Sequence, residues 1–468
     1  MSLSFPDNFI YGAATSSFQI EGSYLIDGAA PSNWYNFSVN NLGIPSEVLN
    51  HKGCKHYINW KNDVQLIHEL SLNSYRFSVS WPRIIPDKDQ LPNSKGLDFY
   101  DHLVDELHRF NISPMLTLFH WDLPQHLEDQ GGWANPESIE WYLHFVETVA
   151  DRLADRVPAW ITINEPWVFL HLGMIKGIHA PGYKDLKHAA SSYKNILMAH
   201  SEAVRILRSY NNCSEIGISC NISPFTPETD SREDVEACQR IHDYHNKLFL
   251  DAWHKGDIPE IASQVFGKHT PKWNSEELRI LQEPIDFIGV NYYTFFRVRY
   301  DPHAFLQARS APPRPPLTDM KWEVYPRGLF KALEWIYNRY HTEIYITENG
   351  CAYTYEPSNS GEVTDNRRID YMYRHLEQCS MAISNGIPLK GYYAWSLLDN
   401  FEWTFALNKR FGLIHVDFDT QKRTIKNSGY FYRDFINGKT EKPDHVRSDV
   451  INQYEGVVWH DDINFRAI

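Results

Sequence analysis

Two glutamates, Glu165 and Glu348, stand in similar short motifs that lie far apart in the chain. Residues 162–166 read Thr-Ile-Asn-Glu-Pro and residues 346–350 read Ile-Thr-Glu-Asn-Gly, so each acid follows an apolar, β-branched stretch and comes just before a turn. Such a stretch predicts a β-strand that ends at the glutamate. Two carboxyl groups brought together at strand ends can break a glycosidic bond, one as nucleophile and the other as general acid and base.

Polar and aromatic side chains follow the other apolar stretches in the same way. Either glutamate alone would more often be a solvated residue that ends a strand, so the neighbouring strand ends decide between the two interpretations. The side chains at or just beyond those ends are Gln19, Glu21, Arg76, Trp81, His120, Trp121, Asn164, Asn221, Asn291, Tyr293, Asn349, Trp395, Glu402 and Trp403. An apolar core does not need so many polar groups, because each buried one must find a partner. The set therefore predicts a polar pocket.

Eight short apolar stretches alternate with helical patterns along the chain. The predicted strands are residues 9–15, 74–81, 113–121, 159–166, 215–222, 286–293, 343–350 and 389–397, and the clearest helical patterns are 57–70, 98–110, 136–153, 188–209 and 327–340. This alternation is typical of an α/β protein built as a (β/α)8 TIM barrel, in which all strands end at one face. We therefore expect a single domain over residues 1–468, with long βα loops that form the active-site mouth.

Two long stretches between the predicted strands look irregular. Residues 19–53 are rich in Gly, Pro, Ser and Asn, which predicts a loop that crosses the barrel mouth. Residues 299–321 contain the proline-rich segment 311–316, which is compatible with a linker between domains. Because the alternation of strands and helices continues after it, we interpret this segment as a rigid surface loop.

The composition limits the partners of the chain. Its formal net charge is −14 and no run of Lys and Arg stands out, so we expect it to bind neither nucleic acid nor an anionic membrane. No stretch has transmembrane length and no signal peptide is evident, which favours a soluble, cytoplasmic protein. Six cysteines without close pairing predict free, mostly buried thiols. The Asn-x-Ser sequons at Asn36, Asn111, Asn212 and Asn221 would then be chance occurrences.

Eight motifs in order resemble those of glycoside hydrolase family 1, the β-glucosidase family, over nearly the whole chain. They lie at residues 9–15 leading to Gln-Ile-Glu-Gly at 19–22, 76–81, 120–124 (His-Trp-Asp-Leu-Pro), 132–133, 164–167 (Asn-Glu-Pro-Trp), 291–293 (Asn-Tyr-Tyr), 346–350 and 395–403 (Trp-Ser-Leu-Leu-Asp-Asn-Phe-Glu-Trp). The resemblance implies a retaining glycosidase on a (β/α)8 barrel, without a metal or an organic cofactor. Its substrate would be a small β-glycoside or oligosaccharide with a terminal glucosyl, or else a galactosyl or fucosyl, residue.

The same resemblance implies a role for each candidate residue. Glu348 would be the nucleophile, and Glu165 the general acid that later acts as base. Arg76 and Tyr293 would keep Glu348 charged, since a nearby cation and hydrogen-bond donors favour a carboxylate. The other matching residues would hold the glucosyl unit (Gln19, His120, Trp121, Asn164, Tyr293, Trp395, Glu402 and Trp403), support the site (Arg76 and Asn291) or form an aromatic wall for the leaving group (Trp322).

Other functions are left open by the sequence. Relatives of this fold that have lost a catalytic glutamate would be silent sugar-binding or interaction proteins, whereas this chain retains both acids. A transglycosidase would let an alcohol replace water in the second step. A metal-dependent hydrolase is disfavoured, because no tight cluster of metal ligands follows the strands. A phospho-β-glucosidase is disfavoured as well, because the charge of Glu402 would repel a 6-phosphate.

The chain departs at several positions from the family pattern that the motifs resemble. Tyr35 stands where the family usually has Asp, and Ala406 and Leu407 stand where many members have Gly-Tyr. Ala406 and Leu407 follow closely after Glu402, so this departure predicts a difference in sugar preference or in the fit of the leaving group. The sequence is compatible with a homo-oligomer and leaves the number of subunits open.

Overall fold

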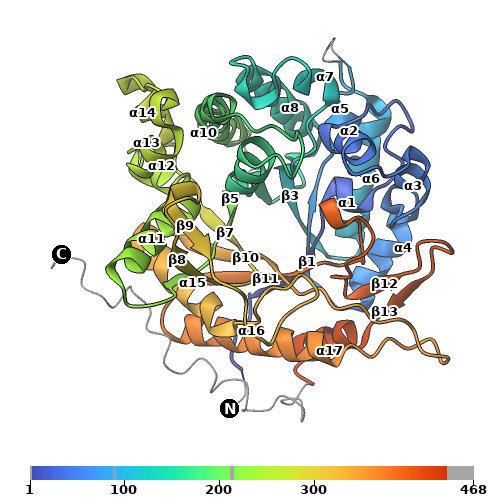
Figure 1. The fold of residues 1–468 in the computed structure, drawn as a ribbon. Coiled ribbons are helices and arrows are strands. Elements are labelled where there is room, and N and C mark those ends of the chain that lie inside the picture. Colours follow the sequence, from blue (N-terminus) through green and yellow to red (C-terminus); the bar gives the residue numbers. More distant parts are fainter. Residues whose placement is uncertain (1–2, 88, 90, 211–214, 440–468) are drawn as a thin grey trace.

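The architecture is a closed parallel barrel surrounded by helices (Figure 1). The structure, a computed structural model, describes residues 3–87, 89, 91–210 and 215–439. The barrel strands close in the order β1-β11-β10-β7-β5-β4-β3-β2. Their bounds are β1 Ile10–Ala14, β2 Ser74–Ser78, β3 Ser113–Phe119, β4 Ala159–Asn164, β5 Glu215–Asn221, β7 Phe287–Tyr292, β10 Glu343–Asn349 and β11 Leu389–Trp395. The predicted TIM barrel is confirmed. The single domain stays a prediction, which also includes residues 440–468 outside the described ones.

Helices cover the outside of the barrel. The long ones are α4 His56–Glu69, α6 Ser94–Arg109, α8 Ser138–Leu153, α10 Leu186–Ser209, α11 Arg232–His242, α15 Pro326–Tyr340, α16 Asn366–Ser384 and α17 Asn427–Ile436. In α6, Phe99, Leu103 and Leu107 recur at helical spacing and are all buried, so one apolar stripe faces the barrel. The five predicted helical patterns lie in α4, α6, α8, α10 and α15, with ends that agree to within four residues.

Short elements fill the connections between the long ones. The short helices are α1 Ser17–Ile20, α2 Asn33–Asn40, α3 Ser46–His51, α5 Trp81–Ile84, α7 Gln125–Glu128, η1 Gly132–Ala134, α9 Pro166–Val168, η2 Phe169–Ile175, η3 Asp243–Lys247, α12 Leu250–Lys255, α13 Ile261–Phe266, η4 Gly267–His269, α14 Ser275–Leu281, η5 Phe305–Gln307 and η6 Trp403–Phe405. Both η2 and η3 are π-helical, with the wider i→i+5 hydrogen bonds. The short strands are β6 Phe225–Pro227, β8 Phe296–Tyr300, β9 Ala308–Ser310, β12 Ile414–Val416 and β13 Arg423–Ile425.

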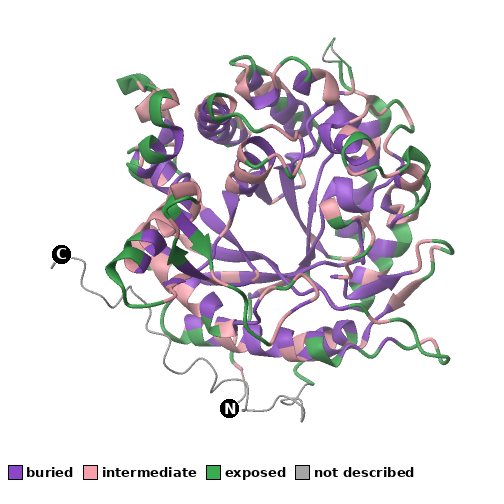
Figure 2. Ribbon diagram, in the orientation of Figure 1, coloured by how far each residue is buried: buried purple, intermediate pink, exposed green. Residues whose placement is uncertain are grey.

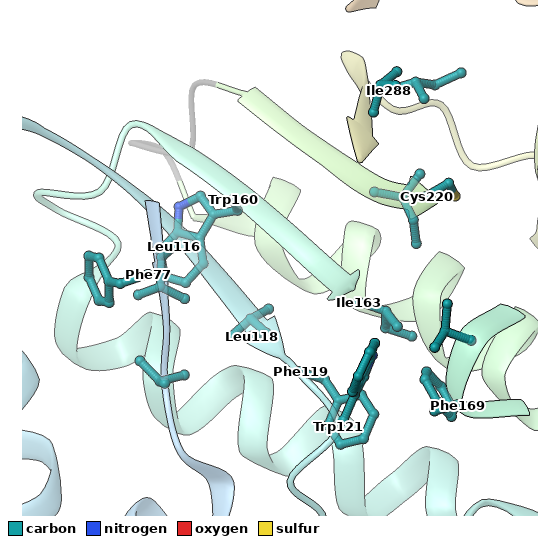
Figure 3. Packing of buried hydrophobic residues seen from close by; sticks show 14 of the residues in the cluster. Phe77, Leu116, Leu118, Phe119, Trp121, Trp160, Ile163, Phe169, Cys220 and Ile288 are labelled. Carbon is teal, nitrogen blue, oxygen red and sulfur yellow. The ribbon is translucent and has the colours of Figure 1, made fainter. Parts of the chain in front are cut away.

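The barrel strands are buried on both faces, as their purple colour in Figure 2 shows. Leu116, Trp160 and Ile163 belong to the large apolar cluster that the strands share with the helices (Figure 3). Their strand neighbours Met115 and Ile161 belong to a second cluster inside the barrel. Because both faces are apolar, the strand sequences read as continuous apolar runs rather than as an alternating pattern.

Two stretches that looked irregular contain regular structure. Residues 19–53 form α2 and α3, and the Ser32 side chain caps α2 by accepting a hydrogen bond from the backbone N–H of Tyr35 (3.0 Å). Within residues 299–321, β9 pairs in antiparallel fashion with β8, which in turn pairs in parallel with β6. The expected surface loop therefore supplies β9 and the end of β8 to a three-stranded sheet, whose third strand, β6, comes from a distant part of the chain.

Five of the six cysteines are described, and all five are buried: Cys54, Cys220, Cys238, Cys351 and Cys379. Cys54, Cys220, Cys351 and Cys379 are free thiols, as the sequence predicted. Cys213 and the sequon at Asn212 lie outside the described residues. In the part of the chain that the structure describes, we find no helix with both the length and the apolar character needed to cross a membrane.

Candidate active site

A cavity of about 850 Å³ lies where the barrel strands end, and both motif glutamates line it. The predicted site residues in its wall are His120, Trp121, Glu165, Asn291, Tyr293, Trp322, Glu348, Trp395, Glu402 and Trp403. Three others, Gln19, Arg76 and Asn164, are buried and hydrogen bond to residues of that wall. The fold therefore brings the whole predicted set of site residues together around one cavity.

Three residues of the strand-end set do not belong to this cavity, and one of them, Asn349, donates through Nδ2 to the carbonyl of Tyr292 (2.7 Å). Glu21 forms an ion pair with Arg83 (2.9 Å) and accepts a hydrogen bond from the Tyr100 hydroxyl (2.6 Å). Trp81 stacks on Phe145 in the core, with ring centroids 4.7 Å apart. Predicting that every polar or aromatic strand end faces one pocket was wrong for these three residues. Trp81 misses the pocket because the strand β2 already ends at Ser78 and Trp81 begins the helix α5.

Glu165 occupies the turn between β4 and α9. Its backbone is left-handed (φ 47°, ψ 61°), a conformation that costs a non-glycine residue about 1 kcal/mol or more. The backbone N–H of Glu165 donates to the carbonyl of Ser219 (2.8 Å), and Pro166 begins the next helix. Asn291 Nδ2 donates to Glu165 Oε1 (2.9 Å). The turn thus holds this carboxyl group in the cavity wall.

Glu348 lies near the end of β10 and is held from two sides. Arg76 Nη1 donates to Glu348 Oε1 (2.7 Å), and the Tyr293 hydroxyl donates to Oε2 (2.6 Å). The other terminal nitrogen of Arg76, Nη2, donates to Asn164 Oδ1 (2.7 Å), so one buried guanidinium connects the two motifs. After the motif, a Cβ atom at Gly350 would lie 1.7 Å from the carbonyl oxygen of Trp395, and only glycine fits there.

A chain of hydroxyl groups orients the amide of Asn291. The Ser219 hydroxyl donates to Thr347 Oγ1 (2.8 Å), which donates to Asn291 Oδ1 (2.7 Å). With its oxygen engaged in this way, Asn291 presents its NH₂ group to Glu165. The sequence indicated no role for Ser219 or the Thr347 side chain, because a hydroxyl inside a strand carries no recognisable motif.

Burial in the cavity wall dominates the acidity of the carboxyl groups. It raises the pKa of Glu165 to about 8, and the negative charge of Glu348 adds to the effect. It also raises the pKa of Glu402 to about 8, again with a contribution from Glu348 and opposed by the hydrogen bond from Gln19. The pKa of Glu348 itself is raised by burial. Arg76 and Tyr293 act in the expected lowering direction but do not cancel that effect.

Aromatic rings and amides surround Glu402 on the inner side of the cavity. Trp121 and Trp403 lie with ring centroids 4.4 Å apart, and Gln19 Nε2 donates to Glu402 Oε2 (3.3 Å). Asn164 Nδ2 donates to His120 Nε2 (3.0 Å), so the ring proton of this histidine lies on Nδ1. Burial and the charge of Arg76 hold the pKa of His120 well below its usual range. This histidine is therefore neutral, and its Nδ1 has no hydrogen-bond partner among the described residues.

The outer side of the cavity is formed by residues that do not lie at strand ends. Trp167 stacks on His171 with centroids 4.6 Å apart and lies 4.1 Å from the ring of His245. The histidines come from η2 and η3, and burial lowers the pKa of each to about 3, so both are neutral. Trp322, which the sequence predicted as an aromatic wall, also lines the cavity, and its ring centroid lies 5.3 Å from that of Tyr293. Reasoning from strand ends missed the histidines, because helical residues next to a barrel give no such signal.

Comparison with known proteins gives one consistent result. The family described as Glycosyl hydrolase family 1 matches residues 1–441. A 1,4-beta-D-glucan glucohydrolase of Thermotoga neapolitana is 41% identical over 441 residues, which cover 93% of this chain and 99% of that protein. Beta-glucosidase A of Thermotoga maritima is 42% identical over 434 residues, covering 92% and 97%. The solved structure of a family 1 β-glucosidase from Thermotoga maritima superimposes with a TM-score of 0.91 at 41% identity, covering 94% of this chain and all of that one.

Proposed function

Because this chain belongs to glycosyl hydrolase family 1, we propose that it cleaves terminal β-D-glucosyl residues with Glu348 as the nucleophile and Glu165 as the acid and base. It is a retaining β-glycosidase of the β-glucosidase type. Retention of configuration requires two displacements at the anomeric carbon, with a covalent glycosyl-enzyme between them. The roles of the individual residues follow from their contacts.

The observation that supports this assignment most directly is the position of Asn291 between the two acids. Its amide donates to Glu165 (2.9 Å) and also lies close enough to Glu348 to lower the pKa of that carboxyl group. The two carboxyl groups therefore approach one another across a single amide. Retaining glycosidases need their acids roughly 5 to 5.5 Å apart, whereas inverting ones leave room for a water molecule between them.

The two acids differ in the groups that stabilise their charge. Glu348 accepts hydrogen bonds from a guanidinium and a phenol, while Glu165 accepts one from a neutral amide. The charged form of Glu348 is the better stabilised of the two, since a direct cation contact is worth more than an amide contact. We assign the proton of the resting enzyme to Glu165 on this ground.

In the first step, the Glu348 carboxylate attacks the anomeric carbon while Glu165 donates its proton to the glycosidic oxygen, and the leaving group departs as an alcohol. Ester formation removes the charge of Glu348, which had raised the pKa of Glu165. The pKa of Glu165 then falls, so its carboxyl group stays deprotonated after the first step and is available as a base. In the second step it takes a proton from water, the water oxygen bonds to the anomeric carbon, and Glu348 leaves as a carboxylate.

The binding roles are part of the same proposal. Glu402, Gln19 and the Nδ1–H of His120 supply hydrogen-bonding groups for sugar hydroxyls, and Trp395, Trp121 and Trp403 supply flat apolar surfaces. The outer rings of Trp167 and Trp322 leave space for an aryl group or a second sugar. Homo-oligomerisation, a cytoplasmic location and the lack of nucleic-acid or membrane partners stay predictions from the sequence.

The decisive test uses an activated 2-deoxy-2-fluoro-β-glucoside, whose electron-poor ring slows the second step. Peptide mass spectrometry should find a covalent sugar on Glu348. A sugar on another residue would refute the assignment. No adduct with either the gluco or the galacto reagent would favour a silent sugar-binding protein. Product analysis with an added alcohol separates the alternatives of hydrolysis and transglycosidase activity.

A further inference from the structure

A second cavity of about 410 Å³ lies next to the one that holds the acids. Its wall is formed by α11, η3, α15 and the chain around β6. The two cavities share Ser223 and Phe225, and the short turn η3 faces both of them. Tyr244 and His245 of η3 line the larger cavity, whereas Lys247 lines the smaller one. We call the smaller one the side cavity.

The side cavity is lined by three cations, Lys247, Lys331 and Arg339, and by no Asp or Glu among the described residues. Each cation has a carboxylate partner that lies outside this lining. Those partners are Asp243 for Lys247, Glu334 for Lys331 and Asp251 for Arg339. In a chain with a formal net charge of −14, a cavity with only cationic charge in its wall is unexpected. The cations border the cavity directly and their carboxylate partners do not, so an anion inside would meet the cationic end of each ion pair.

The charge of two of these cations acts on another residue of the lining. His242 lines the cavity too, and its pKa falls to about 3, mainly through burial and further through the charges of Lys247, His245 and Arg339. A neutral imidazole there adds hydrogen bonding without adding charge.

The rest of the lining would suit the ring of a sugar. Trp335 offers an aromatic face and lies edge-on to His242, with centroids 5.1 Å apart. Gln239 and Asn246 add amide groups to the wall. A cavity of this volume is within the usual range for small-molecule sites, about 300 to 1,000 Å³. Lysine and arginine together favour phosphate, and an aromatic face favours the apolar C–H surface of a sugar.

We propose that the side cavity is a binding site for a small phosphate monoester of a sugar, with the phosphate at Lys247, Lys331 and Arg339 and the sugar ring against Trp335. This site is separate from the glucosyl pocket, where the carboxyl group of Glu402 would repel a phosphate. Its occupation does not depend on the roles assigned to Glu165 and Glu348.

Calorimetric titration of the full chain with glucose 6-phosphate, inorganic phosphate and glucose at constant ionic strength tests the proposal. Glucose 6-phosphate should bind one-to-one and more tightly than inorganic phosphate. Lys331→Ala should weaken both phosphates at least 10-fold, and Trp335→Leu should weaken glucose 6-phosphate while leaving inorganic phosphate unchanged. Lys390→Ala is the matched control, because Lys390 also pairs with a carboxylate (Glu343, 2.6 Å) but lies outside the cavity lining.

Three results would overturn the proposal. The first is the lack of glucose 6-phosphate binding to the unchanged protein. The second is an equal loss of binding in Lys331→Ala and Lys390→Ala, which would indicate a diffuse charge effect. The third is unchanged binding in Lys331→Ala, which would place the anion elsewhere. Should Lys331→Ala fail to fold, as judged by circular dichroism, Lys331→Gln keeps the volume and answers the same question.

Discussion

Two groups of buried charged residues in this enzyme differ in how their acids are paired with cations. In the active site, Glu165, Glu348 and Glu402 line one cavity, and among the described residues only Glu348 forms a salt bridge with Arg76. Under the loop 395–403, the buried Asp399 bonds to Lys426 (2.6 Å) and the buried Asp365 bonds to Arg368. We call this second group the anchor cluster.

The anchor cluster satisfies its acids almost completely. Asp399 also accepts a hydrogen bond from the backbone N–H of Gly412 (3.0 Å), and Asp365 accepts two from Ser428 (2.8 and 2.6 Å). Asp399 precedes Glu402 and Trp403 in the same loop, so the cluster fixes the position of side chains that we propose to bind the sugar. The comparison teaches that burial alone does not define a catalytic acid. In the active site, burial without a matching cation raises the pKa of Glu165 and Glu402 to about 8, and their position in the cavity wall separates them from other buried carboxyl groups such as Glu128.

The largest effect is expected from removing either catalytic acid. Glu348→Ala and Glu165→Ala should each lower kcat/KM roughly 10⁴-fold or more. Added azide should restore turnover of both variants by attacking the sugar from opposite faces. The product should be an α-glucosyl azide with Glu348→Ala and a β-glucosyl azide with Glu165→Ala. Nuclear magnetic resonance of the products identifies the anomer, and exchanged outcomes would exchange the two roles.

Glu128→Gln is the matched control for both variants. Burial raises the pKa of Glu128 to about 7, yet this residue does not line the active-site cavity. The control should keep activity within a few-fold of the unchanged enzyme. A loss similar to that of Glu348→Ala would break the comparison, because any buried carboxyl group would then matter equally.

The anchor cluster should control stability rather than chemistry. Lys426→Met leaves Asp399 buried without its closest cation and should lower the free energy of unfolding by about 3 to 5 kcal/mol. Chemical denaturation measures this loss, with the exposed Lys422→Met as control. Adding Asp399→Asn to Lys426→Met should cost less than the sum of the two single changes. Simple additivity would show that the pair does not act as a unit.

The activity should depend on pH through the two acids of the active site. Glu165 must be protonated for the first step, so kcat/KM should fall as the pH rises through about 8. On the acidic side, kcat/KM should fall when Glu348 takes up a proton. With a strongly activated aryl glucoside, which needs little acid catalysis, Glu165→Gln should lose the alkaline limb. An alkaline limb that persists in this variant would belong to another group.

The unmatched acids should cost the enzyme stability at neutral and alkaline pH. The pKa of Glu402 is raised from its ordinary value of 4.5 to about 8 in the folded protein. Its preference for the protonated form therefore contributes fully to the stability of the fold below pH 4.5, and this stabilisation is lost as the pH rises through 8. Glu402→Gln should therefore stabilise the protein by roughly 1 to 2 kcal/mol at pH 8 and hardly at all at pH 4. Thermal unfolding at both pH values measures the difference, and an equal gain at both would point to packing.

The smallest effect is expected at Ala406, whose carbonyl accepts a hydrogen bond from the backbone N–H of Glu402 (2.6 Å). Its backbone has φ 49° and ψ −126°, which favours glycine. Ala406→Gly should add about 1 kcal/mol to the free energy of unfolding by relieving this strain. Ala406→Val should act in the opposite direction, and equal stabilities of the two variants would contradict the argument.

The sequence was most informative where function depends on strand ends. Glu165 and Glu348 were recognisable because a parallel barrel places every strand end at one face, whatever its helices do. The sheet of β6, β8 and β9 could not be predicted, since strands such as Phe225–Pro227 are too short to show a period and pair with distant segments. His171 and His245 escaped for a related reason, because they reach the cavity from helical turns. The acidity of Glu402 likewise depends on a charge from another strand.

The turn η3 carries a thermodynamic consequence that follows from its two faces. Within Asp243–Lys247, Tyr244 and His245 line the cavity of the acids, and Asn246 and Lys247 line the side cavity. A ligand that shifts this turn from one side alters the affinity of whatever binds on the other. Linkage then requires reciprocity, so the factor by which a phosphate ester changes the binding of a glucoside must equal the factor by which the glucoside changes the binding of the ester.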